Sequence, residues 1–276
     1  MEESLKAAIR EHAELSARAA EHPRLVQGGG GNCSVKASGR MVVKASGYFL
    51  EDVDEKSGYA ILDLATGQAE CREGERLSLE APLHTLLGTY VMHTHPIAVG
   101  ALVCSRQGSA HFKELFAENF YHWIGYAAPG ERLYQKIKES RSASGITAPE
   151  AEVLFLQNHG FFVSARTKDR VLELHERTVL KLEAFFGPLP AAAELPTPAP
   201  GCYFTPDHAV YAGGERANLS EKITRAFHET SLFAKSLLWL IRAKGWEPVG
   251  LKPSEIEFLL GMEEEKYRQK FWKTVR

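Results

Sequence analysis

The sequence lacks the long apolar runs, the excess charge and the cysteine pairs that mark several large classes of protein. No apolar stretch approaches the roughly 18 residues of a membrane-spanning helix, so we expect no membrane contact. The net charge is −2, which excludes the basic footprint of a nucleic-acid-binding protein. The four cysteines show no Cys-x-x-Cys spacing, and we expect free thiols in a reducing cytoplasm.

Features of a targeting segment are absent from the first 20 residues as well. Residues 1–20 are rich in alanine and carry several glutamates, which is typical of neither a signal peptide nor a basic transit peptide. Hydrophobic residues make up 44% of the chain and charged residues 25%, the composition of an ordinary globular protein. A cytoplasmic globular protein is therefore expected.

Hydrophobic periodicity predicts an α/β segment followed by a helical tail. Residues 34–71 alternate as an antiparallel β-meander, and residues 203–212 have the pattern of a hairpin. Ser78 is an acceptable N-cap for a helix that begins near Glu80. We expect the remaining strands over 90–95, 120–126, 151–156 and 161–164, and the remaining helices over 2–20, 98–105, 168–186, 219–244 and from 253 to the end.

Composition also predicts the domain organisation. Residues 188–201 hold five prolines and no periodicity, which indicates a semi-rigid connector. We therefore expect an N-terminal domain over residues 1–187, the connector over 188–201, and a mostly helical C-terminal extension over 202–276. No chemistry is evident in the extension, which we expect to pack on its own core domain or on a neighbouring subunit.

Two histidines stand two residues apart, at His93 and His95, after the apolar residues 90–92. Side chains at i and i+2 of a strand point to one face, so both imidazoles could share one metal ion. His159, where another apolar run ends, is the candidate third ligand, and Gly160 after it suits a tight turn. Three histidines with one open position are typical of catalytic zinc, although unrelated buried histidines would give the same pattern.

Further candidates surround these histidines in the sequence. Glu80 could act as an acid or base, or only complement the dipole of the helix that it begins. The glycines of residues 28–31 free the backbone to bring N–H groups to an anion, although a flexible loop would have the same composition. The spacing required for a P-loop is absent.

Several motifs occur together in the order of one known family. They are Gly31-Asn32-Cys33-Ser34, Ser46-Gly47, Ser78-Leu79-Glu80, His93-Thr94-His95, Tyr126 before Pro129-Gly130, and Asn158-His159-Gly160. Together they resemble the class II aldolase/adducin family, over about residues 25–186. The residues of these motifs are most similar to the aldolase half of bifunctional rhamnulose-phosphate aldolase/alcohol dehydrogenases. Similarity to the same group extends to Thr205–His208 and Glu265–Arg268.

The resemblance implies a fold, a metal and a set of site residues. The implied fold is a three-layer α/β/α sandwich around a mainly antiparallel sheet, commonly assembled as a tetramer. One Zn²⁺ per subunit, or another divalent metal, would be held by His93, His95 and His159. The phosphate of a sugar phosphate would be bound by Gly31, Asn32, Ser46, Gly47 and Ser78. Leu79 stands where family members often carry a second serine, and Lys44 could supply compensating charge.

The resemblance also implies a reaction. A ketose 1-phosphate would be cleaved to dihydroxyacetone phosphate and an aldehyde through an enediolate stabilised by zinc. Glu80 would move the proton at the nucleophilic carbon, and Tyr126 would protonate or stabilise the aldehyde oxygen across a subunit boundary, unless it is an ordinary strand aromatic. Dehydratases and epimerases use the same kind of metal site, but the epimerase pattern has Asp where Glu80 stands. A non-catalytic adducin-like scaffold would lack the three histidines.

Overall fold

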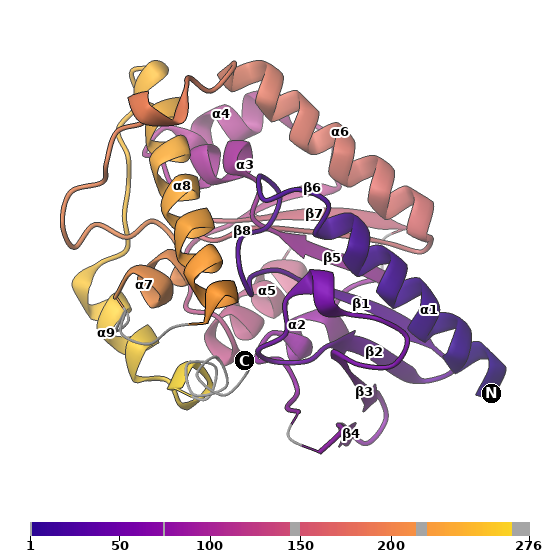
Figure 1. Cartoon of the computed structure of the whole chain (residues 1–276). Helices are drawn as coiled ribbons and strands as arrows, with labels where there is room; N and C mark the ends of the chain where they lie inside the picture. The colour runs from indigo at the N-terminus through magenta and orange to yellow at the C-terminus, as the bar shows by residue number, and fades with distance from the viewer. Residues whose placement is uncertain (1, 74, 144–149, 214–219, 267–276) are drawn as a thin grey trace.

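One mixed sheet runs through the molecule (Figure 1). The computed structural model describes residues 2–73, 75–143, 150–213 and 220–266. Within them, eight strands lie in the order β4-β3-β2-β1-β5-β8-β7-β6. All neighbours are antiparallel except β6 and β7. The strands are β1 (Asn32–Ala37), β2 (Arg40–Lys44), β3 (Tyr59–Asp63), β4 (Ala69–Glu70), β5 (Tyr90–Thr94), β6 (Tyr121–Ile124), β7 (Ala151–Leu156) and β8 (Gly160–Ala165).

The predicted meander forms one half of this sheet, from β1 to β4. Ser38 and Gly39 connect β1 to β2 with φ values of 50° and 76°, as a two-residue hairpin of type I′ requires. In this hairpin Ala37 pairs with Arg40, and β1 pairs on its other side with β5. The meander is therefore attached directly to the strand that carries His93.

Side chains of the central strands alternate between the two faces of the sheet. Val153 and Phe155 of β7 belong to one hydrophobic cluster, whereas Leu154 and Leu156 belong to another. Both clusters are buried because helices cover both faces, which explains why β7 and β8 are apolar in nearly every position. The expected three-layer α/β/α architecture is confirmed.

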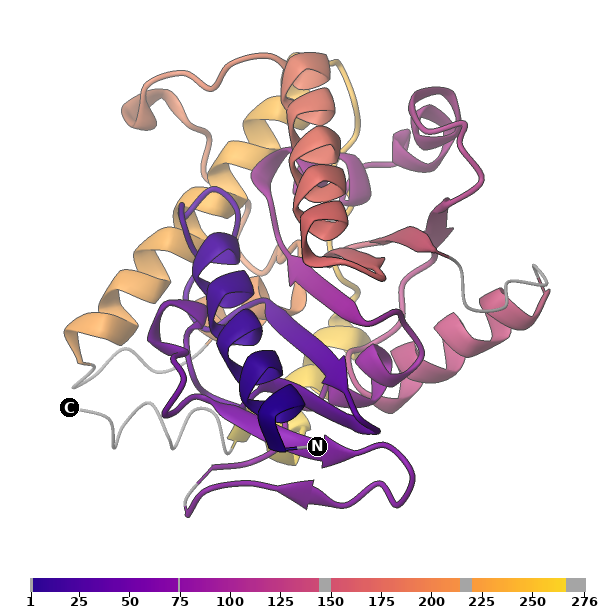
Figure 2. The same cartoon turned by 90° about the vertical axis from the view of Figure 1, so that its right-hand side faces the viewer.

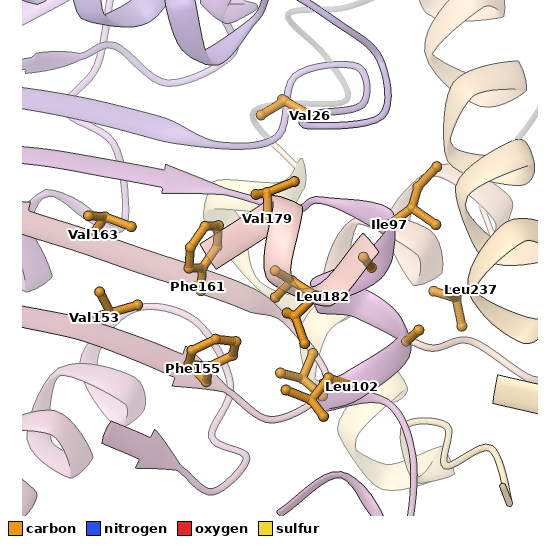
Figure 3. Close-up of a cluster of buried hydrophobic side chains, with 14 of the residues drawn as sticks. Val26, Ile97, Leu102, Val153, Phe155, Phe161, Val163, Val179, Leu182 and Leu237 are labelled. Carbon is orange, nitrogen blue, oxygen red and sulfur yellow. The ribbon is translucent and has the colours of Figure 1, made fainter. Parts of the chain in front are cut away.

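The larger cluster lies under α1 (Glu2–Ala19), α3 (Ile97–Val103), α4 (Gly108–Leu115) and α6 (Lys168–Phe186). Figure 2 shows the indigo helix α1 and the salmon helix α6 on the same face of the sheet. Figure 3 shows how Phe155 and Phe161 from the sheet meet Leu182 of α6 and Leu102 of α3. The smaller cluster lies under α2 (Ala81–Thr85) and α5 (Glu131–Ala143).

The C-terminal extension packs on this core through a long helix. The extension contains α7 (Pro206–Gly213), α8 (Glu221–Ala243) and α9 (Pro253–Gly261). The short helix η2 (Ala192–Glu194) lies in the predicted connector, and η1 (Leu50–Asp52) lies earlier in the chain. Helix α8 lies against α3, and its Phe233 and Leu237 belong to the larger cluster. A Cβ added to Gly100 of α3 would lie 2.8 Å from Phe233, so glycine permits this close approach.

The predicted hairpin over residues 203–212 is wrong, because this segment contains helix α7. Thr205 Oγ1 accepts a hydrogen bond from the backbone N–H of His208, and Pro206 occupies the first helical position. These helix-start signals outweigh the alternating aromatics before them. The helix expected from residue 253 to the end lies outside the described residues beyond residue 266. Residue 219, where another helix was expected to begin, also lies outside them. The division into domain, connector and extension stays a prediction.

Membrane-spanning helices are not found among the described residues, since none of the helices there is both long and apolar enough. The four cysteines are free, as expected from their spacing.

Two leucines of α8 provide a matched test of this packing. Leu237 is fully buried, whereas Leu232 is 44% exposed. We expect Leu237→Ala to lower the free energy of unfolding by about 2–5 kcal/mol, because it leaves a cavity between α8 and the core. Leu232→Ala should change it by less than about 0.5 kcal/mol. Urea unfolding measures both values, and equal effects would contradict the packing described.

Candidate metal centre

Three buried histidines meet at the end of the central strands. His93 lies in β5, His95 follows that strand, and His159 lies in the turn between β7 and β8. The Nε2 atom of His93 is 3.0 Å from Nε2 of His95 and 3.3 Å from Nε2 of His159. The ligand atoms of all three lie within 4.8 Å of one another. The structure thus brings together the residues that the sequence predicted as metal ligands.

The hydrogen bonds of the outer ring nitrogens decide which way the lone pairs point. His93 Nδ1 donates to the backbone oxygen of Phe161 at 3.0 Å, because a carbonyl can only accept. His95 Nδ1 is 3.2 Å from Oδ2 of Asp207, so this ring nitrogen faces a carboxylate. In His93 the lone pair is therefore on Nε2, and this atom faces Nε2 of His95.

This arrangement fits a divalent cation. Burial lowers the pKa of His93 well below its ordinary value, and the neighbouring histidines lower it further, so the ring is neutral. A cation between the Nε2 atoms of His93 and His95, which are 3.0 Å apart, would accept a lone pair from each ring. Ligand nitrogens about 2.05 Å from a tetrahedral zinc ion are about 3.3 Å apart, close to the separations found here. The expected donor set is thus sterically and electrostatically suited to a metal.

The turn that carries His159 is held in place by its neighbours. Asn158 adopts a left-handed φ of 54°, and its Nδ2 donates to the backbone oxygens of Phe204 (3.1 Å) and Val249 (2.7 Å). The sequence suggested Gly160 for the tight turn, but glycine serves another purpose there. A Cβ on Gly160 would lie 2.5 Å from both His95 Cδ2 and the backbone oxygen of Thr94.

Glu80 faces the same space from the start of α2. Its Oε1 lies 3.4 Å from Nε2 of His159 and 3.6 Å from Nε2 of His93. Glu80 itself is the N-cap residue, so the expected N-cap at Ser78 is wrong. Ser78 Oγ instead accepts from the backbone N–H of Glu80 at 3.3 Å, which helps to set the start of the helix.

A pocket opens beside the three histidines and contains most of the predicted phosphate-binding residues. Gly31, Ser46, Gly47 and Ser78 line it, together with Lys44. Asn32 lies behind this wall, where its Nδ2 donates to Ser78 Oγ at 2.8 Å. The other lining residues are Gly29, Gly30, Leu79, Glu80, His95, Pro129, His159, Pro206, Asp207, Glu264 and Glu265.

The glycine loop is tied to the protein more firmly than its composition suggests. The N–H of Gly28 donates to Glu229 Oε2, and that of Gly29 to the hydroxyl of Tyr211, both at 2.8 Å. The N–H of Gly30 donates to the backbone oxygen of Gln27 at 3.1 Å. Three of the four glycine N–H groups thus already donate within the chain. We therefore expect only Gly31 of this loop to contribute to anion binding.

Tyr126 is not among the residues that line the pocket. Its side chain belongs to a cluster with Ala128, Ala209 and Leu251. The hydroxyl is buried, has no hydrogen-bond partner among the described residues, and has a pKa raised mainly by burial. A catalytic role for Tyr126 in a neighbouring subunit stays a prediction.

Sequence reasoning missed Asp207. Its position is one residue inside the helix that begins at Pro206, which a Thr-Pro-Asp helix start could have indicated. Nothing in its spacing connects it with His95, which is more than 100 residues away. Glu264 and Glu265 were missed for the same reason.

Comparisons with known proteins agree with this fold. The model of the class II aldolase and adducin N-terminal domain family matches residues 10–179. The N-terminal class II aldolase domain of a conserved protein from Thermoplasma acidophilum has a TM-score of 0.54 and 22% identity, over 65% of this chain and 93% of that chain. An L-fuculose 1-phosphate aldolase has a TM-score of 0.52 and 17% identity, over 95% and 96% of the two chains. At these identities the likeness shows the fold.

A similar curated protein is much longer than this chain. It is the uncharacterized oxidoreductase YuxG of Bacillus subtilis (strain 168), 30% identical over 95 residues. These residues are 34% of this chain and 13% of that protein.

The metal centre can be tested by removing one ligand. Protein stripped with a chelator and reloaded should bind one zinc ion per chain, whereas His95→Ala should not retain zinc through gel filtration, because two imidazoles remain. His228→Ala, at an exposed histidine of α8, is the control. Elemental analysis measures the metal content. Full zinc occupancy in His95→Ala would rule out this ligand assignment.

Proposed function

The chain belongs to the class II aldolase and adducin family, and from that premise we propose a zinc-dependent aldolase that cleaves a ketose 1-phosphate to dihydroxyacetone phosphate and an aldehyde. The observation that carries the proposal is the meeting of three imidazole rings and the carboxylate of Glu80 in one buried space. A metal site open to a pocket suits a reaction in which negative charge develops on substrate oxygens.

His93, His95 and His159 would hold the metal. When bound, zinc would act as a Lewis acid that polarises the substrate carbonyl and stabilises the negative charge formed as the C3–C4 bond breaks. The histidines are buried, with exposed fractions of 0–4%, so water competes little with the substrate for this space. The metal is a divalent ion by family, and zinc is our proposal on the basis of the all-nitrogen donor set.

Glu80 would move the proton at the nucleophilic carbon. In the cleavage direction, its protonated form would donate a proton to C3 of the departing three-carbon unit; in the synthetic direction, its carboxylate would remove that proton. Oε1 is within 3.6 Å of two of the proposed ligands, so a substrate held by the metal would lie within its reach.

The phosphate would bind between Gly31, Ser46, Gly47 and Ser78, with Asn32 orienting the Ser78 hydroxyl. Lys44 would contribute positive charge, since its Nζ is held at this wall by the backbone oxygens of Gly29 (3.2 Å) and Tyr48 (2.7 Å). Leu79 lines the same wall without a hydrogen-bonding group. Family members often carry a serine where Leu79 stands, and Lys44 would thus compensate for its absence here.

Tyr126 would complete the site of a neighbouring subunit in a homotetramer, acting on the aldehyde oxygen. Tyr126 does not line the pocket of its own chain, so this role rests on the family resemblance. Sugar-phosphate dehydratases and epimerases remain the alternatives on the same metal site. A product assay separates them: dihydroxyacetone phosphate with an aldehyde indicates the aldolase, and loss of water to a diketone indicates a dehydratase.

The proton-transfer role of Glu80 predicts a specific kinetic defect. Glu80→Gln keeps the shape of the side chain but removes the base, so turnover should fall about 10²-fold or more while zinc stays bound. Exchange of dihydroxyacetone phosphate protons with deuterated water, followed by NMR, isolates this step from aldehyde binding.

Glu221→Gln serves as the matched control for Glu80. Glu221 is an exposed acidic residue in the first turn of α8. If Glu80 only complements a helix dipole, both changes should cost under about 1 kcal/mol of stability and leave proton exchange intact. Wild-type exchange in Glu80→Gln would thus assign the base to another group.

The phosphate pocket predicts a change in substrate preference. Ser46→Ala removes a hydroxyl from the pocket wall and should raise KM for a ketose 1-phosphate roughly tenfold, the cost of one hydrogen bond to a charged group. KM for the unphosphorylated ketose should not change. Ser109→Ala, at an exposed serine of α4, is the control. Equal reactivity of phosphorylated and unphosphorylated ketoses in the wild type would argue against the phosphate site.

A further inference from the structure

The carboxylate paired with His95 comes from the C-terminal extension, in the first turn of α7. We propose that Asp207 is a positioning residue that orients His95 toward the metal, so that the extension completes the metal centre. The proposal rests on the metal centre of the proposed function but not on the reaction carried out there. The sequence had indicated no chemistry for this part of the chain.

The first argument is the geometry of the pair. Asp207 Oδ2 lies 3.2 Å from Nδ1 of His95, on the side of the ring opposite to the Nε2 that faces His93. The two side chains are 12% and 5% exposed, so the contact is largely shielded from water. A carboxylate in this position keeps the proton on Nδ1, holds the ring orientation and makes Nε2 a more basic ligand.

The second argument is the space that the glycine loop leaves for this pair. A Cβ on Gly30 would lie 2.4 Å from Asp207 Oδ2 and 3.0 Å from His95 Nδ1. The backbone of Gly30 does not have the left-handed φ found at Gly28 and Gly31, so its conformation does not require glycine. Glycine is needed at this position because the carboxylate and the imidazole occupy the space of a side chain.

The third argument is that Asp207 is rigidly placed. Thr205 Oγ1 accepts from the N–H of His208 at 3.3 Å, and Nδ1 of His208 accepts from the N–H of Phe204 at 3.1 Å. The backbone oxygen of Phe204 accepts in turn from Asn158, the residue before His159. The segment that positions Asp207 is therefore hydrogen-bonded to the turn that carries another proposed ligand.

Contacts between the glycine loop and the extension support the same conclusion. Tyr211 of α7 and Glu229 of α8 accept the N–H groups of Gly29 and Gly28. A Cβ on Gly28 would lie 2.8 Å from the Cβ of Ala226 in α8. Since the family model matches only residues 10–179, these contacts are a feature of this chain beyond that match.

The experiment measures metal affinity rather than activity. Metal-free full-length protein is titrated with zinc against a chromogenic chelator, for the wild type, Asp207→Asn and Asp207→Ala. Loss of an outer-sphere partner of a metal ligand typically weakens binding 10–100-fold, and we expect a loss in this range for Asp207→Ala. Asp207→Asn should lose less, because its amide oxygen can still accept from Nδ1. The visible spectrum of the cobalt-substituted protein should also change, since the ring of His95 is no longer held.

Gly30→Ala tests the pair from the opposite side, with Asp207 intact. It should weaken zinc binding by pushing the carboxylate away from His95. The double variant Gly30→Ala/Asp207→Ala should bind zinc no more weakly than Asp207→Ala, because both changes remove the same interaction. This arm keeps the test valid if one of the Asp207 variants fails to fold.

Two controls separate orientation from charge and from stability. Glu264→Gln removes a carboxylate that lines the same pocket but does not contact His95. An equal loss of affinity in Glu264→Gln would overturn the proposal in favour of a general charge effect. Thermal unfolding of the metal-free variants detects a structural role: a lower melting temperature with wild-type zinc affinity would also overturn it.

The outcome does not depend on the assignment of the reaction. If the wild type binds zinc but cleaves no ketose phosphate, the proposed function fails while the role of Asp207 is still decided by the affinities. If the wild type binds no divalent metal, both proposals are overturned. Wild-type affinity in Asp207→Ala would overturn the role of Asp207 alone.

Discussion

The candidate site depends on keeping three imidazole rings close together inside the protein. The Nε2 atoms of His93 and His95 are 3.0 Å apart. Nδ1 of His93 donates to the backbone oxygen of Phe161, and Nδ1 of His95 faces Asp207. Ring nitrogens held this close in a buried space are well suited to share one cation. The fold must therefore hold the rings in place before a metal binds.

The packing around the site explains how this rigidity arises. His93 is stacked on Phe162, with ring centroids 4.1 Å apart, and β5 pairs with both β1 and β8 in the middle of the sheet. His95 fits against Gly160, where any side chain would collide with it. Asn158 takes the strained left-handed conformation in the turn, and its amide is satisfied by two backbone oxygens from the extension. The central sheet thus positions the strand that carries His93, and residues distant in sequence hold the other two histidines in place.

The glycine loop has a different role in the structure from the one that its sequence indicated. Four consecutive glycines indicate a loop that could present several N–H groups to an anion. In the structure, Gly28 and Gly29 donate to α8 and α7, and Gly30 makes room for the pair of Asp207 and His95. The glycines serve mainly for close packing between the loop and the extension, and only Gly31 is left for the role first expected.

The apolar strands, the helix over 168–186 and the His-x-His spacing could be predicted from the sequence, because each is a local periodicity. His159 and Glu80 were also candidates from the sequence, and the structure places both beside His93. The segment over 203–212 was predicted wrongly because its alternation and its helix-start signals compete locally. The contact of Asp207 with His95 could not be predicted, since the two residues meet only when α7 packs against the glycine loop. Local preference is determined within a few residues of the chain, whereas the contacts that complete the site depend on how distant segments fill one shared volume.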